Sequence, residues 1–209
     1  MKKIVFWGAT GQAKVLRGIV EAQGFRLVMV FDNRREVTPP FLDVPMRYGK
    51  RGFEDWVEFA EDAYCLSAIG GHRGADRLER QRYMARHGLT PAVAIHSRAC
   101  VEPGTKIGPG SQVLANATIC VDAILGHACI INTNASVDHE CRLGDGVHIG
   151  PGATLCGLVD VGDCAFVGAG AVVLPRVRIG HNAIVGAGAV VIRDVDDGVT
   201  VYGNPAKSR

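Results

Sequence analysis

The chain has 209 residues, of which 47% are hydrophobic and 21% are charged, and its formal net charge at pH 7 is +2. These values are typical of a soluble globular protein and exclude a disordered chain. Because 23 basic residues nearly balance 21 acidic ones, the sequence carries no electrostatic signature for binding nucleic acid or an anionic membrane.

The N-terminus and the cysteines favour a cytoplasmic protein. The apolar stretch after Lys2 and Lys3 stops after about five residues at a glycine turn, which is too short for a signal peptide. No other stretch is apolar for long enough to predict insertion into a membrane. Seven cysteines without a CxxC pair agree with a reducing compartment and argue against a disulfide framework or a structural zinc site.

Residues 1–92 alternate strand and helix signals. Residues 3–7 form a short apolar run that ends in the glycine turn GATG, and residues 12–24 then carry apolar side chains at helical spacing. A second apolar run, RLVMVFD, ends at Asp32, and a third, AYCLSAIGG, ends in two glycines ahead of a polar helix over residues 75–88. This order predicts a small Rossmann-like α/β domain, built on a βαβ unit with a parallel sheet.

The carboxyl ends of these strands are the expected binding site of the domain. In open parallel sheets, ligands bind beyond the carboxyl ends, where the residues that follow each strand come together. The loop GATGQAK lacks a full GxGxxG pattern and is a weak signal, although a helix N-terminus there could hold a phosphate through backbone N–H groups. The expected contacts for a nucleotide-type ligand are Thr10, Gly11, Gln12, Asp32, Asn33 and Gly70.

A six-residue period runs through the rest of the chain. Every sixth residue from Ile95 to Val191 is Ile, Leu or Val, which makes seventeen consecutive aliphatic positions. Glycine follows the aliphatic residue in eight hexads, and a small residue usually stands four positions after it. This pattern predicts a solenoid in which three hexads make one triangular coil and the aliphatic residues stack about 4.8 Å apart. Glycine would take corner conformations that a Cβ forbids, and the small residues would fill the cramped interior.

The hexads resemble those of the hexapeptide-repeat acyltransferases, and further motifs narrow the resemblance. The loop GATGQ, the AIG segment, HEC within the repeats, a later histidine and a terminal GNPAK together are similar to the PglD/NeuD group of bacterial sugar acetyltransferases. With a boundary near Pro91, we expect a nucleotide-sugar-binding α/β domain over residues 1–92 and a left-handed parallel β-helix over residues 93–209. The resemblance also implies acetyl-CoA as co-substrate, no metal, and a homotrimer with active sites between subunits.

The segment VDHECR breaks the repeat with charge and imidazole. Asp138, His139 and Glu140 have no place in a stacked aliphatic core, so we expect them to project from the surface. Acetyl transfer from a thioester to an amine needs a base near neutral pH, and imidazole suits that role. The resemblance assigns His139 as general base and Glu140 as the acid that raises its basicity. Since neighbouring residues of a strand face opposite ways, this pairing needs a local turn, and Asp138 is the alternative partner.

The resemblance also assigns an acetyl-CoA groove. His148 matches a residue that contacts acetyl-CoA near the thioester, where its ring or a backbone N–H could stabilise the developing oxyanion. Gly157, Ala169 and Ala187 match positions that line the same groove. Because one flat face of a prism offers little concavity, neighbouring columns have to form the groove together.

Three functions fit the sequence to different degrees. The first is an N-acetyltransferase acting on the amino group, at C4, of a nucleotide-linked amino sugar for bacterial surface polysaccharide or glycan synthesis. The second is an O-acetyltransferase of a sialic-acid-like sugar, served by the same residues. The third is a zinc lyase like the γ-carbonic anhydrases, which needs three converging histidines. His139 and His148 are nine residues apart on different faces, and residues 1–92 would have no role, so the sequence favours the first function.

Overall fold

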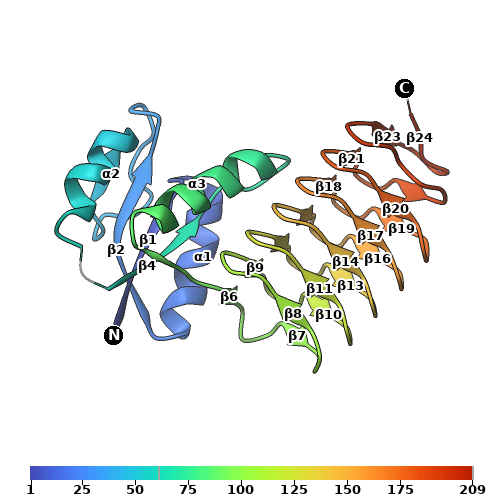
Figure 1. The fold of residues 1–209 in the computed structure, drawn as a ribbon, viewed down its shortest axis with the longest axis horizontal. Helices are drawn as coiled ribbons and strands as arrows, with labels where there is room; N and C mark the ends of the chain where they lie inside the picture. Colours follow the sequence, from blue (N-terminus) through green and yellow to red (C-terminus); the bar gives the residue numbers. More distant parts are fainter. Residues whose placement is uncertain (61, 209) are drawn as a thin grey trace.

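The computed structural model describes residues 1–60 and 62–208, which form an α/β domain beside a long triangular column (Figure 1). The domain has a five-stranded parallel sheet in the order β3-β2-β1-β4-β5. Its elements are β1 (Lys2–Trp7), α1 (Gly11–Ala22), β2 (Phe25–Asp32), β3 (Met46–Tyr48), α2 (Gly49–Val57), β4 (Ala63–Ser67), α3 (Gly74–Arg86) and β5 (Thr90–Pro91). The predicted Rossmann-like arrangement is confirmed, and β3, α2 and β5 are additions to it.

Apolar side chains on both faces of β1 place helices on both sides of the sheet. Ile4 packs in one hydrophobic cluster with Leu16 of α1. Val5 and Trp7, which point the other way, pack in a second cluster with Phe53 of α2. The rings of Trp7 and Phe53 have centroids 5.3 Å apart. The sheet is therefore buried on both faces, as a parallel sheet requires.

The column is built from short strands, each of which ends on one of the seventeen periodic aliphatic residues. The strands are β6 (Ala94–Ile95), β7 (Cys100–Val101), β8 (Lys106–Ile107), β9 (Gln112–Val113), β10 (Thr118–Ile119), β11 (Ile124–Leu125), β12 (Ile130–Ile131), β13 (Ser136–Val137), β14 (Arg142–Leu143), β15 (His148–Ile149), β16 (Thr154–Leu155), β17 (Asp160–Val161), β18 (Phe166–Val167), β19 (Val172–Val173), β20 (Arg178–Ile179), β21 (Ile184–Val185) and β22 (Val190–Val191). β23 (Thr200–Tyr202) and β24 (Lys207–Ser208) close the far end as an antiparallel pair.

Three sheets make the three faces of the column. Face 1 has the order β24-β23-β21-β18-β15-β12-β9-β6, face 2 the order β22-β19-β16-β13-β10-β7, and face 3 the order β20-β17-β14-β11-β8. Ile119 pairs with Val101 on one side and Val137 on the other, so one coil takes eighteen residues. The aliphatic residues and small residues such as Ala117 form one continuous buried core. The predicted triangular solenoid of hexapeptide repeats is confirmed.

The glycines of the column act differently from the prediction. Those that follow the aliphatic residues, such as Gly162, have ordinary backbone angles, but a Cβ there would lie 2.6 Å from the backbone nitrogen of His181 in the next coil. They are needed for close contact between coils, so the expected corner conformation is wrong for these positions. Left-handed angles occur two residues later, at Gly152 (φ 63°) but also at Asn134 and Glu140 (each φ 58°).

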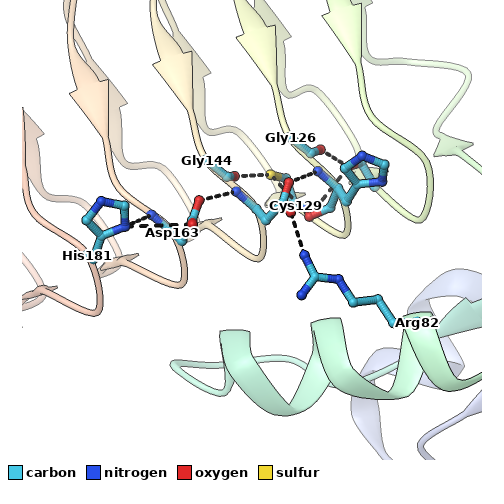
Figure 2. A network of polar contacts seen from close by, with 9 residues as sticks. Arg82, Gly126, Cys129, Gly144, Asp163 and His181 are labelled. Carbon is cyan, nitrogen blue, oxygen red and sulfur yellow. Dashed lines mark hydrogen bonds and ion pairs between the residues drawn. The ribbon is translucent and has the colours of Figure 1, made fainter.

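The α/β domain packs on face 1 and on the corner between faces 3 and 1, called corner 3–1 below. Leu16 and Leu66 share a hydrophobic cluster with Ile130 of the column. At corner 3–1, the Arg82 guanidinium of α3 lies 2.9 Å from Asp145 Oδ2 (Figure 2). The same corner carries a ladder in which each backbone N–H donates to a side chain one coil further, from His127 to Asp145, Asp145 to Asp163, Asp163 to His181 and His181 to Asp197.

Ala92 joins the two halves of the chain. Its backbone N–H donates to Cys65 O of β4 at 3.0 Å, and its carbonyl accepts from the N–H of Gly110 in the column at 2.9 Å. Since one residue bonds to both halves, the boundary between residues 92 and 93 stays a prediction. The hydrogen bonds hold the first coil of the column against the sheet.

Candidate active site

His139 and Glu140 lie together in the turn between β13 and β14, at the corner between faces 2 and 3, called corner 2–3 below. The left-handed angle of Glu140 breaks the alternation of a strand and brings its Oε2 to 3.0 Å from His139 Nδ1. The expected local turn is therefore present. Asp138 does not take this place, because its Oδ1 accepts a 2.7 Å hydrogen bond from the backbone N–H of His139. The His139 and Glu140 side chains are 47% and 54% exposed.

Gly157 leaves the space that the His139 ring occupies. It stands one coil beyond His139 at corner 2–3, and the N–H of Leu158 beside it donates to His139 O at 3.0 Å. A Cβ on Gly157 would lie 2.6 Å from Cε1 of the ring and would overlap Nε2. The imidazole thus leans over a coil that has no side chain at this position.

This arrangement sets the proton positions of the imidazole. A carboxylate oxygen can only accept, so Nδ1 of His139 carries the hydrogen in its bond to Glu140. Nε2 then holds the lone pair and lies above Gly157. A ring held in this tautomer at a partly exposed corner is able to accept a proton from a bound amine.

His148 lies on face 1, beneath the α/β domain, and is only 4% exposed. Its Nδ1–H donates to Gly71 O at 2.9 Å, its Nε2 accepts from Asn132 Nδ2 at 3.0 Å, and its backbone N–H donates to Ala165 O at 3.1 Å. Burial lowers the pKa of His148 to about 4, so the ring is neutral at pH 7. Because its ring N–H and its backbone N–H are both engaged, neither is free to stabilise an oxyanion in this conformation. Its contact with acetyl-CoA stays a prediction.

The remaining residues predicted to bind acetyl-CoA lie on a third part of the column. Ala169 and Ala187 are exposed and stand one coil apart at the corner between faces 1 and 2. Face 2 separates them from His139, Glu140 and Gly157. The structure therefore brings the predicted catalytic pair and Gly157 together, but a groove lined by both groups would need two copies of the chain.

The six residues expected to bind a nucleotide-type ligand all line one pocket of about 420 Å³. It lies beyond the carboxyl ends of β1, β2 and β4, as the sheet topology predicts. Thr10 is the N-cap of α1, so the positive end of that helix faces the pocket. Gly8 has φ 116°, and a Cβ there would lie 2.8 Å from the Ala68 carbonyl carbon, so only glycine lets the ends of β1 and β4 approach.

Asp32 fixes two loops of this pocket. Its Oδ2 accepts from the Ala9 N–H and its Oδ1 from the Arg34 N–H, each at 3.0 Å, and Arg34 Nε lies 3.2 Å from Oδ1. Burial alone would raise the pKa of Asp32, but these hydrogen bonds outweigh it and hold the pKa below its usual range. The carboxylate is therefore ionised at pH 7 and carries a negative charge at the edge of the pocket.

Sequence reasoning missed six residues that line the same pocket, among them the two arginines Arg34 and Arg73. Arg34 pairs with Asp32, and Arg73 Nε lies 2.8 Å from Asp76 Oδ2. Guanidinium groups are well suited to bind a diphosphate. Both arginines follow strands, β2 and β4, and the residues that follow parallel strands meet at one edge of the sheet. Their place in the sequence could therefore have identified them as pocket residues.

Over residues 1–60 and 62–208, no helix combines the length and the apolar character needed to cross a bilayer. In the same described residues, no three His, Cys, Asp or Glu side chains gather as a metal site. His139 and His148 lie at corner 2–3 and on face 1, so a single chain does not bring these two histidines of the lyase alternative together.

The chain is similar to known proteins in its repeats and, for solved structures, over its whole length. Residues 122–157 and 159–193 match the family model described as bacterial transferase hexapeptide (six repeats). PerB from Caulobacter crescentus, solved in complex with CoA and GDP-perosamine, is 37% identical, with 100% of this chain and 98% of that chain covered and a TM-score of 0.91. The acetyltransferase domain of PglB from Neisseria gonorrhoeae, solved with acetyl coenzyme A, is 30% identical, with 100% and 99% covered and a TM-score of 0.88. The comparison with curated proteins gave no match.

These similarities include the α/β domain as well as the repeats. WeeI from Acinetobacter baumannii is also similar, with 26% identity, 100% of both chains covered and a TM-score of 0.88. A likeness confined to the hexads would indicate only a column of this kind, whereas PerB matches both halves at 37% identity. The chain therefore belongs to the PglD/NeuD-type family of hexapeptide-repeat sugar acetyltransferases and is an acyltransferase.

Proposed function

We propose that the protein transfers the acetyl group of acetyl-CoA to the amino group at C4 of a nucleotide-linked amino sugar, in the synthesis of a bacterial surface polysaccharide or glycan. The observation that carries this proposal is the bond between His139 Nδ1 and Glu140, which leaves Nε2 as a base at an exposed corner. The complexes of PerB with CoA and GDP-perosamine, and of the PglB domain with acetyl coenzyme A, support the two substrate classes.

In the proposed reaction, His139 Nε2 removes a proton from the attacking amine. The amine nitrogen forms a bond to the thioester carbonyl carbon, and the tetrahedral intermediate then breaks its C–S bond. The CoA thiolate leaves and takes a proton from the imidazolium, which restores neutral His139. Glu140 holds the ring through Nδ1 and stabilises the imidazolium while it exists.

The pocket of the α/β domain suits a nucleoside diphosphate. Its volume of about 420 Å³ lies within the range of ordinary small-molecule sites. The N-terminus of α1 and the side chains of Arg34 and Arg73 supply positive potential for two phosphates. Gln12 and Asn33 add amide groups that can bind a base or a ribose.

In a trimer, the pocket of one chain and His139 of a neighbouring chain can lie close together. The α/β domain packs on face 1, whereas His139 lies at corner 2–3, which is the corner opposite that face in a triangular column. A sugar held in the pocket of one chain therefore meets the histidine of a neighbouring chain. In this proposal the symmetric trimer has three equivalent active sites, each built from two subunits.

The test is a thiol-release assay with acetyl-CoA and a panel of GDP-, UDP- and dTDP-linked 4-amino sugars. We expect at least one to release CoA thiol, and His139→Ala to lower turnover by about two to four orders of magnitude. His127→Ala is the matched control, because His127 is an exposed column histidine at another corner, and it should keep normal turnover. Near-normal turnover of His139→Ala would remove this residue from the mechanism, and activity with hydroxyl acceptors alone would favour the O-acetyltransferase.

A further inference from the structure

The loop of residues 69–73 is a wall shared by two pockets. On one side, Ile69 and Arg73 line the pocket proposed to bind the sugar nucleotide. On the other side, His72 and Arg73 line a second pocket of about 320 Å³ against Ile184 on face 1 of the column. The position and shape of this loop therefore decide the shape of the acceptor site.

Arg77 of α3 ties this loop to the column. Its side chain is fully buried, and in the described part of the chain its guanidinium bonds only to backbone carbonyls. Its Nη1 donates to Ile69 O at 3.0 Å, its Nε to Ala128 O at 2.8 Å and its Nη2 to Gly146 O at 2.6 Å. Burial lowers the pKa of Arg77 to about 10, so it remains charged at pH 7. Burying a charge without an acidic partner is costly, which argues for a specific use.

A second connection fixes the middle of the loop. His148 of the column donates from Nδ1 to Gly71 O at 2.9 Å, and its own orientation is set by Asn132. The first turn of α3 presses directly on corner 3–1, because a Cβ on Gly74 would lie 2.5 Å from Gly146 O. The carbonyl of Ile69 is thus held by Arg77, which is itself bonded to the column, and the carbonyl of Gly71 is held by His148 of the column.

We propose that Arg77 and His148 are positioning residues for the acceptor pocket: the column fixes the loop of residues 69–73 through them and so shapes the wall that receives the sugar nucleotide. This inference rests on the proposed function for the identity of the ligand. In this inference, the buried ring of His148, which is hydrogen-bonded through both of its nitrogens, holds the loop in place in the chain without ligands.

The experiment measures binding of GDP, UDP and dTDP, without acetyl-CoA, by titration calorimetry. For the nucleotide that the wild type binds, Arg77→Lys and His148→Phe should each weaken affinity about tenfold or more, which corresponds to about 1.4 kcal/mol. The compact ammonium group of lysine lacks the planar fork of donors with which Arg77 reaches three separate carbonyls, and phenylalanine keeps the packing on Phe166 but loses the donor. His148→Gln retains an N–H donor and should recover part of the affinity. If Arg77→Lys does not fold, the two His148 variants decide.

Arg82→Ala is the matched control. It removes an ion pair between α3 and corner 3–1 without touching the loop, so nucleotide affinity should stay within about twofold of wild type. Hydrogen exchange of the amides in residues 69–73 should become faster in Arg77→Lys and His148→Phe but not in Arg82→Ala. In the transfer assay, the KM of Arg77→Lys for the sugar nucleotide should rise while its kcat at saturation changes by less than about threefold.

The outcomes separate this inference from the function on which it rests. Wild-type affinity and unchanged hydrogen exchange in Arg77→Lys and His148→Phe would overturn the positioning role while leaving the nucleotide pocket intact. Failure of the wild-type protein to bind any of the three nucleotides would overturn the proposed pocket and the positioning role together.

Discussion

At the scale of single residues, the candidate base depends on two neighbours that shape the backbone. Glu140 reaches the ring only because its backbone has φ 58°, at a position where the column tolerates residues other than glycine. Gly157 leaves the volume that the ring fills. The position of His139 Nε2 is therefore set by the next coil as much as by its own turn.

Gly157→Ala should displace the His139 ring and lower turnover by about ten- to a hundredfold, because small errors in placing a catalytic group are costly. The measurement is the thiol-release assay at saturating substrates. Gly18→Ala on α1 is the control, since a Cβ there would meet no atom within 4 Å, and it should leave turnover unchanged. Full activity of Gly157→Ala would mean that the ring position is not critical.

His148 should make the protein sensitive to acid. Its pKa of about 4 in the folded chain lies below the ordinary value of 6.5, so the unfolded chain binds more protons between these values. The stability that a neutral His148 confers is complete above pH 6.5 and is lost as the pH falls toward 4, by about 3 kcal/mol in all. Urea unfolding of wild type and His148→Phe should show a flatter pH dependence in the variant. Parallel curves for the two proteins would contradict this assignment.

At the scale of elements, the coils use glycine in two distinct ways. Gly162→Ala should destabilise the column by about 1–3 kcal/mol, because its Cβ would press on the backbone of the next coil. Gly152→Asn should change stability by less than about 0.5 kcal/mol, since it has open space and the corresponding positions one and two coils earlier are Asn134 and Asn116. Chemical denaturation of both variants tests this, and a larger loss for Gly152→Asn would reverse the interpretation.

The sequence predicted the column well because its period is imposed by local geometry. Each of the seventeen periodic aliphatic residues from Ile95 to Val191 ends a strand, since the same spacing recurs in every coil. The helix α2 was missed because it is short, contains two glycines and buries only Phe53 fully. The role of Gly162 was misjudged because contact with the next coil is not visible in a linear pattern.

The site was predictable from the sequence only in part. The residues after each strand of the α/β domain identified the pocket, because parallel strands end at one edge of a sheet. Arg77 gave no signal, since a buried arginine in a polar helix looks like a solvated one until the column is placed against it. The surroundings of His148 were missed because they depend on Gly71, which is distant in sequence.

At the scale of the whole molecule, the chain separates the two sites that the proposed reaction must join. The pocket lies in the domain packed on face 1, and His139 lies at the opposite corner. We therefore expect the protein to sediment as a trimer, and dilution below the trimer's dissociation range to abolish transfer while nucleotide binding persists. A fully active monomer in analytical ultracentrifugation and assay would contradict an active site built from two chains.

Mixed trimers test the central claim most directly. Gly11→Trp fills the nucleotide pocket with a side chain that the fold can accept, because a Cβ at Gly11 would meet no atom within 4 Å, whereas His139→Ala removes the base. Each variant alone should be inactive. Co-expression of the two with different tags, followed by purification of the mixed trimers, should restore about a third of wild-type turnover, because one of the three sites in each mixed trimer combines an intact pocket with a neighbour's histidine. Mixed trimers as inactive as either parent would contradict the account.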